Sequence, residues 1–166
     1  MTHRNRRQFL ATTIALSAAT AFPLAAQNAD TSPPKRPPAL PLELIKPFVV
    51  AAHKSLQETR ALLSEHPELI NATWDWGGGD YETALGGAAH MGHRDIALYL
   101  LEKGARIDLF AAAMLGMTDF VGAALRSNPE FLKTPGPHGI PLIAHAEKGG
   151  EPAADTLAYL KRLTSD

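Results

Sequence analysis

The sequence predicts an all-α solenoid of about four stacked helix pairs, joined by short β-hairpin or finger loops. The first observation is internal similarity, because AAHKSLQETRALLSEHPELIN (51–71) aligns without gaps to AMLGMTDFVGAALRSNPEFLK (113–133). The second is the spacing of apolar residues by three and four positions, which is typical of amphipathic helices. The third is a series of equivalent positions, with leucines at Leu85, Leu109 and Leu142 and glycines at Gly92, Gly116 and Gly149.

The unit at residues 83–108 shows the pattern most clearly. Small residues at 84–89 make a thin first helix that neighbouring helices can approach closely. Gly92 breaks the chain before a second helix, which is expected over 93–103, and Gly104 is expected as a left-handed residue just past its end. One such pair cannot bury its apolar face alone, so several must stack. The buried stripe of the second helix is expected to comprise Ile96, Leu100 and Leu101.

The other units carry apolar residues of the same kind, and these are expected to form the rest of the core. The predicted core residues are Leu56, Leu62, Leu63, Leu69 and Ile70 in the first unit, Phe120, Val121, Leu125, Phe131 and Leu132 in the third, and Leu157, Leu160 and Leu163 in the fourth.

These units resemble ankyrin repeats. In the second unit, Thr83-Ala84-Leu85-x-x-Ala88-Ala89-x-x-Gly92-His93 stands for the family's Thr-Pro-Leu-His-x-Ala-Ala-x-x-Gly-His, and the fourth unit supplies Pro141-Leu142. The resemblance covers roughly residues 43 to 163. The third unit is shorter, since the equivalent leucines are 24 and then 33 residues apart, so its hairpin should be nearly absent. The resemblance implies a monomeric, non-enzymatic module that binds a protein partner through the concave face formed by the first helices and the fingers.

Composition limits the range of functions. The chain has 166 residues, 45% of them apolar, which suits one domain with one core. Arg4, Arg6 and Arg7 are the only charged residues of the first 26, so the remainder carries 13 basic and 17 acidic residues, a net charge of −4. A mildly acidic body argues against binding nucleic acid or anionic membranes. The absence of cysteine excludes disulfides, thiolate zinc sites and a cysteine nucleophile.

The N-terminus, residues 1–26, is predicted to be an export signal peptide. RNRRQFLATTIALSAATAFPLAA (4–26) combines a basic start, a weakly apolar stretch and small residues, and is too short for a comfortable membrane span. Asn5 to Leu10 resembles the twin-arginine export signal, and an ordinary secretory signal is the alternative. Either route delivers the protein to the periplasm, with cleavage near Ala26 or Ala29. The Pro-rich stretch 27–42 is expected to be a disordered tether, or a ligand for a proline-binding partner, before the repeat domain at 43–166.

The glycine-rich stretch WDWGGGDY (74–81) invites a ligand-binding interpretation. No Lys-Ser or Lys-Thr pair follows the glycines, as a phosphate loop requires, and the acid spacing of a calcium loop is missing. A dinucleotide-binding turn would need a helix starting at the glycines. In the repeat pattern this stretch is the hairpin between units, with the glycines as turn residues. It is therefore predicted to be a projecting finger.

The finger aromatics leave two interpretations open. Trp74 and Trp76 point to the same side of an extended strand. Either both fold back on the helices, or Trp76 and Tyr81 act as exposed anchors for a partner. A sugar-stacking role is a further alternative. PGPHG (135–139) is expected to form a second finger. The predicted partner-binding residues are Trp74, Asp75, Trp76, Asp80, Tyr81, His90, Met91 and His138.

The histidines do not show the spacing of a zinc triad, so no metal, cofactor or catalytic residue is assigned. His90 and His93 belong to the repeat pattern around Gly92, where they are expected to make structural hydrogen bonds. His145 is expected to be a satisfied inner-face residue. No serine lies on a nucleophile elbow. The alternative to a protein-binding module is a small-molecule or metal-binding protein or enzyme that uses the 74–81 loop and nearby histidines; a self-associating structural protein is a third possibility.

Overall fold

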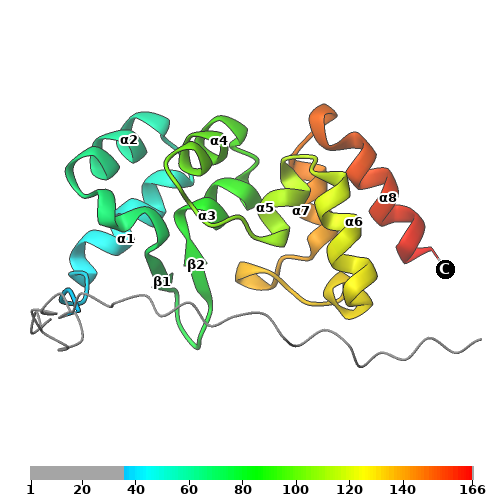
Figure 1. The fold of residues 1–166 in the computed structure, drawn as a ribbon, viewed down its shortest axis with the longest axis horizontal. Coiled ribbons are helices and arrows are strands. Elements are labelled where there is room, and N and C mark those ends of the chain that lie inside the picture. Colours follow the sequence, from blue (N-terminus) through cyan, green and yellow to red (C-terminus); the bar gives the residue numbers. More distant parts are fainter. Residues whose placement is uncertain (1–35, 166) are drawn as a thin grey trace, which may run out of the picture. The chain divides into compact units, whose positions relative to one another are not determined.

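A computed structural model describes residues 36–165 of the chain, so the predicted signal peptide and most of the predicted linker lie outside the described residues. Pro38–Asp166 forms one compact unit. Helices dominate the described residues, with eight α-helices and one two-stranded sheet, which confirms the all-α prediction (Figure 1). None of the described helices is long and apolar enough to cross a membrane.

The elements follow one another in four segments. The α-helices are α1 (Leu42–Ala52), α2 (Leu56–Glu65), α3 (Ala84–Met91), α4 (Arg94–Glu102), α5 (Leu109–Met114), α6 (Thr118–Ser127), α7 (Leu142–Lys148) and α8 (Ala154–Thr164). The short 3-10 helices are η1 (Pro67–Asn71), η2 (Pro129–Leu132), η3 (Pro137–Gly139) and η4 (Glu151–Ala153). The strands are β1 (Thr73–Asp75) and β2 (Tyr81–Thr83), which pair antiparallel with Trp74 opposite Glu82.

Successive helices pack in pairs, and the pairs pack on one another. α1 packs on α2, α3 on α4, α5 on α6, and α7 on α8. The first helices of the pairs also contact each other in order, α1 with α3, α3 with α5, and α5 with α7 (Figure 1). This order places β1, β2 and the first helices next to each other, which determines where the candidate site lies.

Side-chain caps explain where three of the helices begin. The hydroxyl of Ser55 accepts the Glu58 amide at 3.1 Å and starts α2, and the hydroxyl of Thr83 accepts the Gly86 amide at 3.1 Å and starts α3. The carboxylate of Asp108 accepts an amide of α5 at 2.7 Å. Such caps satisfy amide groups that have no partner within the helix. Among the described residues, no strand lies between α4 and α5. This agrees with the prediction that the shorter third unit nearly lacks a hairpin.

Gly104 follows α4 with the predicted left-handed backbone, at a φ of 95°, and two of the three equivalent glycines are also left-handed. Gly92 ends α3 with a φ of 80°, and Gly116 follows α5 with a φ of 75°. A side chain at Gly116 would overlap with the carbonyl oxygen of Pro152, so the turn also needs glycine for close backbone packing. The fourth unit differs from this arrangement by one residue. Gly149 is helical, and Gly150 takes the left-handed conformation with a φ of 63°.

The buried residues form two contiguous clusters, and α5 contributes to both. The first cluster extends over α1 to α5 and includes Phe48, Leu85 and Leu100, while the second extends over α5 to α8 and includes Leu142 and Leu160. Most predicted core residues are buried or pack against these clusters. Three predictions are wrong, because Phe120, Phe131 and Leu163 are exposed. On α6, Val121 and Leu125 face the core, so Phe120, one residue before Val121, points away. Leu163 lies in the last turn of α8, the last helix of the described residues.

Candidate functional site

The hairpin of β1 and β2 (residues 73–83, called the finger below) is closed by hydrogen bonds within its own tip. The Trp76 amide donates to the Asp80 carbonyl at 2.9 Å. The carboxylate of Asp75 accepts the amides of Gly77 and Gly79 at 2.8 and 3.2 Å. The Asp75 carboxylate therefore shapes the turn, and its role as a partner-binding residue stays a prediction.

Glu82 is a buried acidic residue of the finger. It lies in the middle of β2, next to the exposed Tyr81, and its own exposed fraction is 1%. Because successive residues of a strand point to opposite sides, the exposure of Tyr81 turns Glu82 inward toward the helices. A buried carboxylate is costly unless it is paired and hydrogen-bonded.

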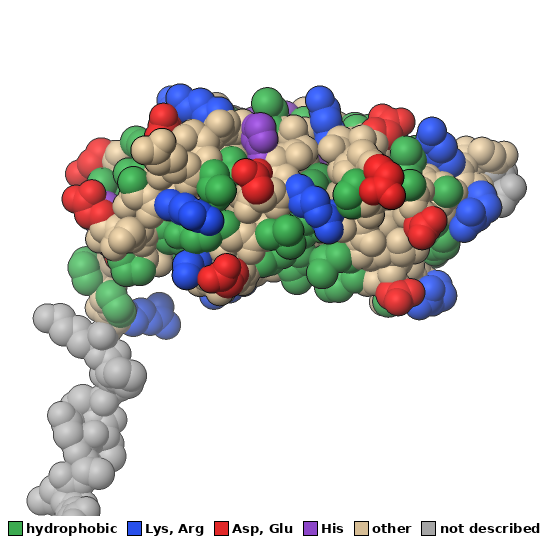
Figure 2. Space-filling view, turned by 90° about the horizontal axis from the view of Figure 1, so that it is seen from above, with side chains coloured by type: hydrophobic (Ala, Val, Ile, Leu, Met, Phe, Trp, Pro, Cys, Tyr) green, Lys and Arg blue, Asp and Glu red, His purple; other side chains and the backbone are tan. Residues whose placement is uncertain are grey.

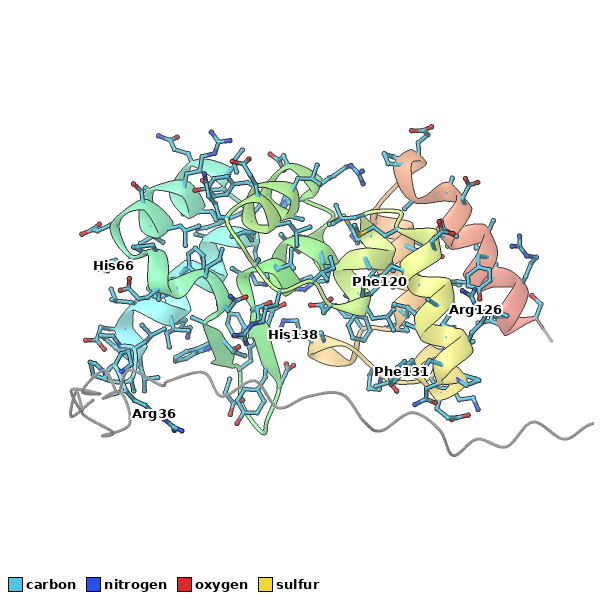
Figure 3. All side chains as sticks on the ribbon, in the orientation of Figure 1. Arg36, His66, Phe120, Arg126, Phe131 and His138 are labelled. Carbon is cyan, nitrogen blue, oxygen red and sulfur yellow. The ribbon has the colours of Figure 1, made fainter. Side chains whose placement is uncertain are left out.

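Three histidines from distant segments surround this carboxylate. His53 ends α1, His90 lies on α3, and His138 belongs to η3, from which it points toward the finger (Figure 3). The distances to the Glu82 carboxylate oxygens are 3.2 Å from His53 Nε2, 2.9 Å from His90 Nδ1 and 3.4 Å from His138 Nε2. The Trp76 indole N–H donates to the same carboxylate at 2.8 Å. We call Glu82 and these three histidines the Glu82 cluster.

The outer ring nitrogens of two histidines are also fixed. His53 Nδ1 donates to the Val49 carbonyl at 2.8 Å. His138 Nδ1 donates to the Asp80 carboxylate at 2.7 Å, and the His138 backbone amide donates to the other oxygen of Asp80 at 2.8 Å. These bonds orient both rings so that the opposite nitrogen, Nε2, faces Glu82.

The backbone of His138 is strained. Its φ of 58° places it in the left-handed region, and it is the only non-glycine residue of the described chain with a positive φ. Such a conformation costs on the order of 1–3 kcal/mol and persists where the surroundings determine it, often at functional sites. The two hydrogen bonds that His138 donates to the Asp80 carboxylate hold it in this conformation.

Gly87 makes room for His53. A side chain at Gly87, on the buried face of α3, would lie 2.5 Å from Cε1 of the His53 ring. The small residues of α3, which the repeat pattern explains by helix packing, thus also allow an imidazole to lie against this helix. The four aromatic rings around Glu82 contact each other, with centroids of His53 and His90 4.8 Å apart and those of His90 and His138 5.2 Å apart.

The contacts change the acidity of the cluster. Burial by itself would raise the pKa of Glu82, but the contacts with His53, His90 and Trp76 outweigh it and hold this pKa well below its usual range. The Glu82 carboxylate in turn raises the pKa of His53, against the opposite effect of burial. The backbone amide of His138 lowers the pKa of Asp80, and its imidazole adds to the effect. Glu82 is therefore a buried anion that needs positive charge beside it.

Two atoms of the cluster remain without a partner. Oε1 of Glu82 and Nδ1 of His90 are buried, and among the described residues neither has a hydrogen bond, although they are 2.9 Å apart. The distance suits a hydrogen bond, but the direction of the N–H does not. Unsatisfied buried polar atoms are uncommon in native proteins and point to a missing partner, such as water or an ion.

The predicted partner-binding residues divide into two groups. Tyr81 is 62% exposed, Trp76 is 37% exposed, and Met91 is also exposed. Trp74 instead packs on the first core cluster, with the Lys46 ammonium 5.4 Å from its ring centroid. Asp75 and Asp80 belong to the finger tip, and His90 and His138 belong to the Glu82 cluster.

One of these predictions needs correction. His90 is not an exposed contact residue, since its side chain is 9% exposed and faces Glu82. Asp80 accepts two hydrogen bonds from His138, and its role as a partner-binding residue stays a prediction. The second finger predicted at 135–139 is a 3-10 turn, closed by a 2.9 Å bond from the Gly136 amide to the Ile140 carbonyl.

Sequence reasoning did not bring His53 and Glu82 into the site. The alternation of a strand could have indicated Glu82, because an exposed Tyr81 requires the next side chain to point inward. The convergence of His53, His90 and His138 depends on the packing of α1, α3 and η3, which spacing along the chain does not show.

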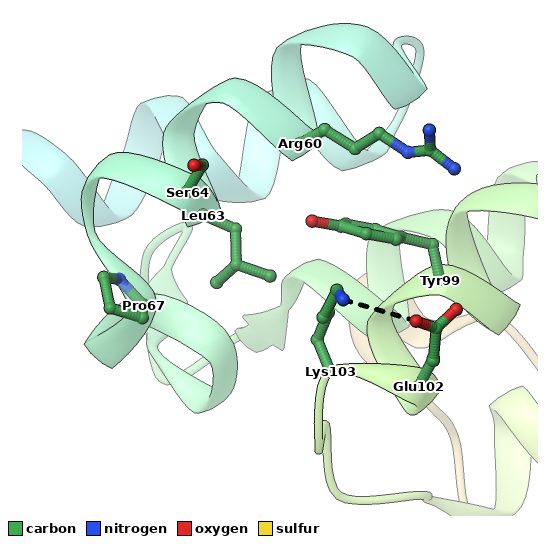
Figure 4. A pocket seen from close by; sticks show the side chains of 7 residues that line it. All are labelled: Arg60, Leu63, Ser64, Pro67, Tyr99, Glu102 and Lys103. Atoms are coloured by element: carbon green, nitrogen blue, oxygen red, sulfur yellow. Dashed lines mark hydrogen bonds and ion pairs between the residues drawn. The ribbon is translucent and has the colours of Figure 1, made fainter.

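A separate cleft lies between α2 and α4, on the helices away from the finger (Figure 4). Its volume is about 660 Å³. The Tyr99 ring lies between the Arg60 guanidinium, 4.9 Å from its centroid, and the Lys103 ammonium, at 5.7 Å. These cations already pair with the ring, and the cleft shares no residue with the Glu82 cluster. The lining residues are Arg60, Leu63, Ser64, Pro67, Tyr99, Glu102 and Lys103.

His145 is a second buried histidine, on α7, and only half of its polar atoms are satisfied. Nδ1 donates to the Pro141 carbonyl at 3.1 Å, while Nε2 has no hydrogen-bond partner among the described residues. The ring packs against Phe110, with centroids 4.9 Å apart. Burial lowers the pKa of His145. The prediction of an inner-face residue agrees with its burial, but the prediction that it is satisfied is wrong for Nε2.

No protein-family model, curated protein or solved structure matches this chain. The chemistry of the Glu82 cluster follows from its donors, which are imidazole nitrogens and carboxylate oxygens. Such donors can hold a cation or exchange protons. The exposed aromatics beside the cluster can contact another molecule.

Proposed function

We propose that this protein is an exported, periplasmic, ankyrin-like repeat protein that binds a protein partner without catalysing a reaction. The partner would contact the finger face, which we define as Trp76 and Tyr81 on the finger and the η3 turn around His138. The order in which the helix pairs pack on one another and the left-handed glycines at Gly92 and Gly116 support the ankyrin-like arrangement. The N-terminal sequence supports export.

The observation that carries this proposal is the double hydrogen bond between Asp80 and His138. It joins the finger to η3 across 58 residues of sequence, so that two loops behave as one surface. A surface that is already rigid loses little conformational entropy on binding, and affinity gains from this preorganisation. Exposed tyrosine and tryptophan are the side chains that most often dominate protein interfaces.

The charge distribution also fits a protein partner better than a nucleic acid. On the face seen in Figure 2, basic and acidic side chains are interspersed over the helices and no basic stripe forms. Nucleic-acid binding requires clustered positive charge that neutralises phosphates. The finger face instead offers aromatic rings next to bonded carboxylates.

The test is affinity capture from an envelope extract with the wild-type chain and two alanine variants. Tyr81→Ala removes the most exposed aromatic of the finger, whereas Leu98→Ala removes a 48% exposed apolar side chain from α4 and serves as the control. We expect a specifically captured protein to be lost with Tyr81→Ala and retained with Leu98→Ala. Equal capture by all three chains would contradict binding through the finger face.

A further inference from the structure

We propose that His53, His90, His138 and Glu82 form a binding site for one divalent transition-metal ion of the zinc class. The site lies at the base of the finger, where α1, α3 and η3 meet, and it goes beyond the proposed partner binding. One donor atom from each of the four residues lies within 4.8 Å of the others.

The positions of the protons are the first argument. The Val49 carbonyl can only accept, so Nδ1 of His53 carries a proton, and the Asp80 carboxylate likewise requires a proton on Nδ1 of His138. In the neutral rings, both Nε2 atoms are then bare lone pairs, and both face the Glu82 carboxylate at 3.2 and 3.4 Å. Lone pairs facing an anion repel it, so the arrangement needs a positive charge between them. Two added protons or one metal dication can supply that charge.

The distances are the second argument. In a tetrahedral zinc site with bonds of 2.0–2.1 Å, neighbouring ligand atoms are about 3.3 Å apart. The Nε2 atoms of His53 and His138 face Oε2 of Glu82 at 3.2 and 3.4 Å, and His90 Nδ1 faces Oε1 at 2.9 Å. One donor atom from each residue lies within 4.8 Å of the others, so the longer separations must shorten toward the tetrahedral spacing when an ion binds. The atoms left without hydrogen bonds, Glu82 Oε1 and His90 Nδ1, are two of the donors that an ion would use.

The partners of the outer nitrogens are the third argument. Histidines that bind metals usually donate their other N–H to a carboxylate or a backbone carbonyl, which fixes the tautomer and the ring orientation. His138 has the carboxylate of Asp80 in this role, and His53 has the carbonyl of Val49. The strained backbone of His138 shows that the fold fixes this orientation at a cost in energy.

The types of ligand atom in the cluster determine which metal ions it can bind. Three imidazoles and one carboxylate suit Zn²⁺ and its neighbours among the transition metals, whereas Ca²⁺ and Mg²⁺ require mainly oxygen ligands. Four protein ligands would also fill a tetrahedral site, as in structural zinc centres. The ion would join the end of α1, α3, the finger and η3 at one point.

The test is a calorimetric titration of the full exported chain with Zn²⁺ after treatment with a chelator. We expect one Zn²⁺ per chain, and each of the variants His53→Ala, His90→Ala and His138→Ala should weaken binding more than 100-fold. His66→Ala is the matched control, because His66 lies at the end of α2 among other carboxylates, and this variant should bind like the wild type. Equal Zn²⁺ affinity in the wild type and all four variants would overturn the proposal.

One further variant and one further measurement distinguish loss of the metal site from loss of the fold. Asp80→Ala leaves all four ligands in place and removes only the partner of His138, so we expect a loss of affinity of roughly 10- to 100-fold. Circular dichroism of each variant establishes that the chain is folded. Because His138 is exposed, His138→Ala should disturb the fold least. A folded His138→Ala chain that binds Zn²⁺ as tightly as the wild type would show that the cluster is only a hydrogen-bonded structural feature.

Discussion

Asp80 and His138 are separated by 58 residues and are joined by two hydrogen bonds, one from the backbone amide at 2.8 Å and one from the imidazole at 2.7 Å. Because one carboxylate accepts both bonds, Asp80 fixes the backbone of η3 and also the orientation of the His138 imidazole ring. The two bonds join the finger to the η3 turn, and they hold His138 beside the buried Glu82. The predictions below test this connection, the packing around it and the core that supports it.

The first prediction concerns the mobility of η3. Asp80→Ala removes both acceptors of His138, so the strained backbone at this residue should relax and the turn should open more often. We expect faster hydrogen exchange at residues 136–140, measured by mass spectrometry of peptides from this segment. Asp95→Ala, which removes an exposed carboxylate from the first turn of α4, is the control and should leave this segment unchanged. Slow exchange at 136–140 in the Asp80 variant would show that Asp80 does not hold the turn.

The second prediction concerns the contact between Gly87 and His53. An added methyl group at Gly87 would lie 2.5 Å from the His53 ring, so Gly87→Ala should push the ring away from Glu82. We expect a changed imidazole NMR signal of His53 and a lower free energy of unfolding than in the wild type.

A double-mutant cycle provides the control for this prediction. In a His53→Ala background the clash is absent, and alanine is favoured over glycine inside a helix, so Gly87→Ala should then be neutral or stabilising. If Gly87→Ala costs the same with and without the His53 ring, the two residues are not coupled.

The third prediction compares two leucines of α4. Leu100 is fully buried in the first core cluster, whereas Leu98 is 48% exposed on the same helix. Leu100→Ala should lower the free energy of unfolding by about 2–5 kcal/mol, because it removes buried apolar surface and leaves a cavity. Leu98→Ala should change it by less than about 0.5 kcal/mol. Urea denaturation of both variants checks the assignment of the inner and outer faces, and similar losses would contradict it.

The fourth prediction concerns pH. Burial lowers the pKa of His145 below its ordinary value of 6.5; the bond to Pro141 and the carboxylates of Asp108 and Glu82 oppose this effect, and His90 adds to it. Between the folded and unfolded pKa values, the unfolded chain binds more protons than the folded chain. The contribution of His145 to stability is therefore fully present above pH 6.5 and is lost as the pH falls below it.

The measurement is the free energy of unfolding of the wild type and of His145→Gln between pH 8 and pH 5. The two chains differ only at residue 145, so the difference between the two profiles reports the effect of the His145 side chain. We expect the wild type to lose more stability on acidification than the variant. Parallel profiles would mean that His145 is not buried as a neutral ring.

The sequence predicted the helical class and much of the element order, because these depend on local signals. The stripe of Ile96 and Leu100 defined α4, and the residue types at Thr83 and Asp108 are those that cap helices. Errors arose where tertiary packing decides, as at Phe120, whose burial depends on which face of α6 meets its neighbours. The left-handed glycine of the fourth unit is Gly150, one residue after the equivalent position Gly149, because α7 is followed by one more residue before the turn.

The candidate site was less predictable. Tyr81 and Trp76 were identified by residue type, and both are exposed in the structure. His53, Glu82 and His138 are far apart in the chain, and only the packing of α1 on α3 and of η3 on the finger brings them together. A single sequence contains the ligand types but not the contacts that make them neighbours.

The most direct test of the Glu82 cluster is a crystal structure of the protein grown with one equivalent of Zn²⁺, with anomalous diffraction recorded on both sides of the zinc absorption edge. The account predicts one anomalous peak per chain, about 2.0–2.2 Å from nitrogens of His53, His90 and His138 and from an oxygen of Glu82. A peak at another position, or an empty cluster in which protonated histidines alone surround Glu82, would contradict it.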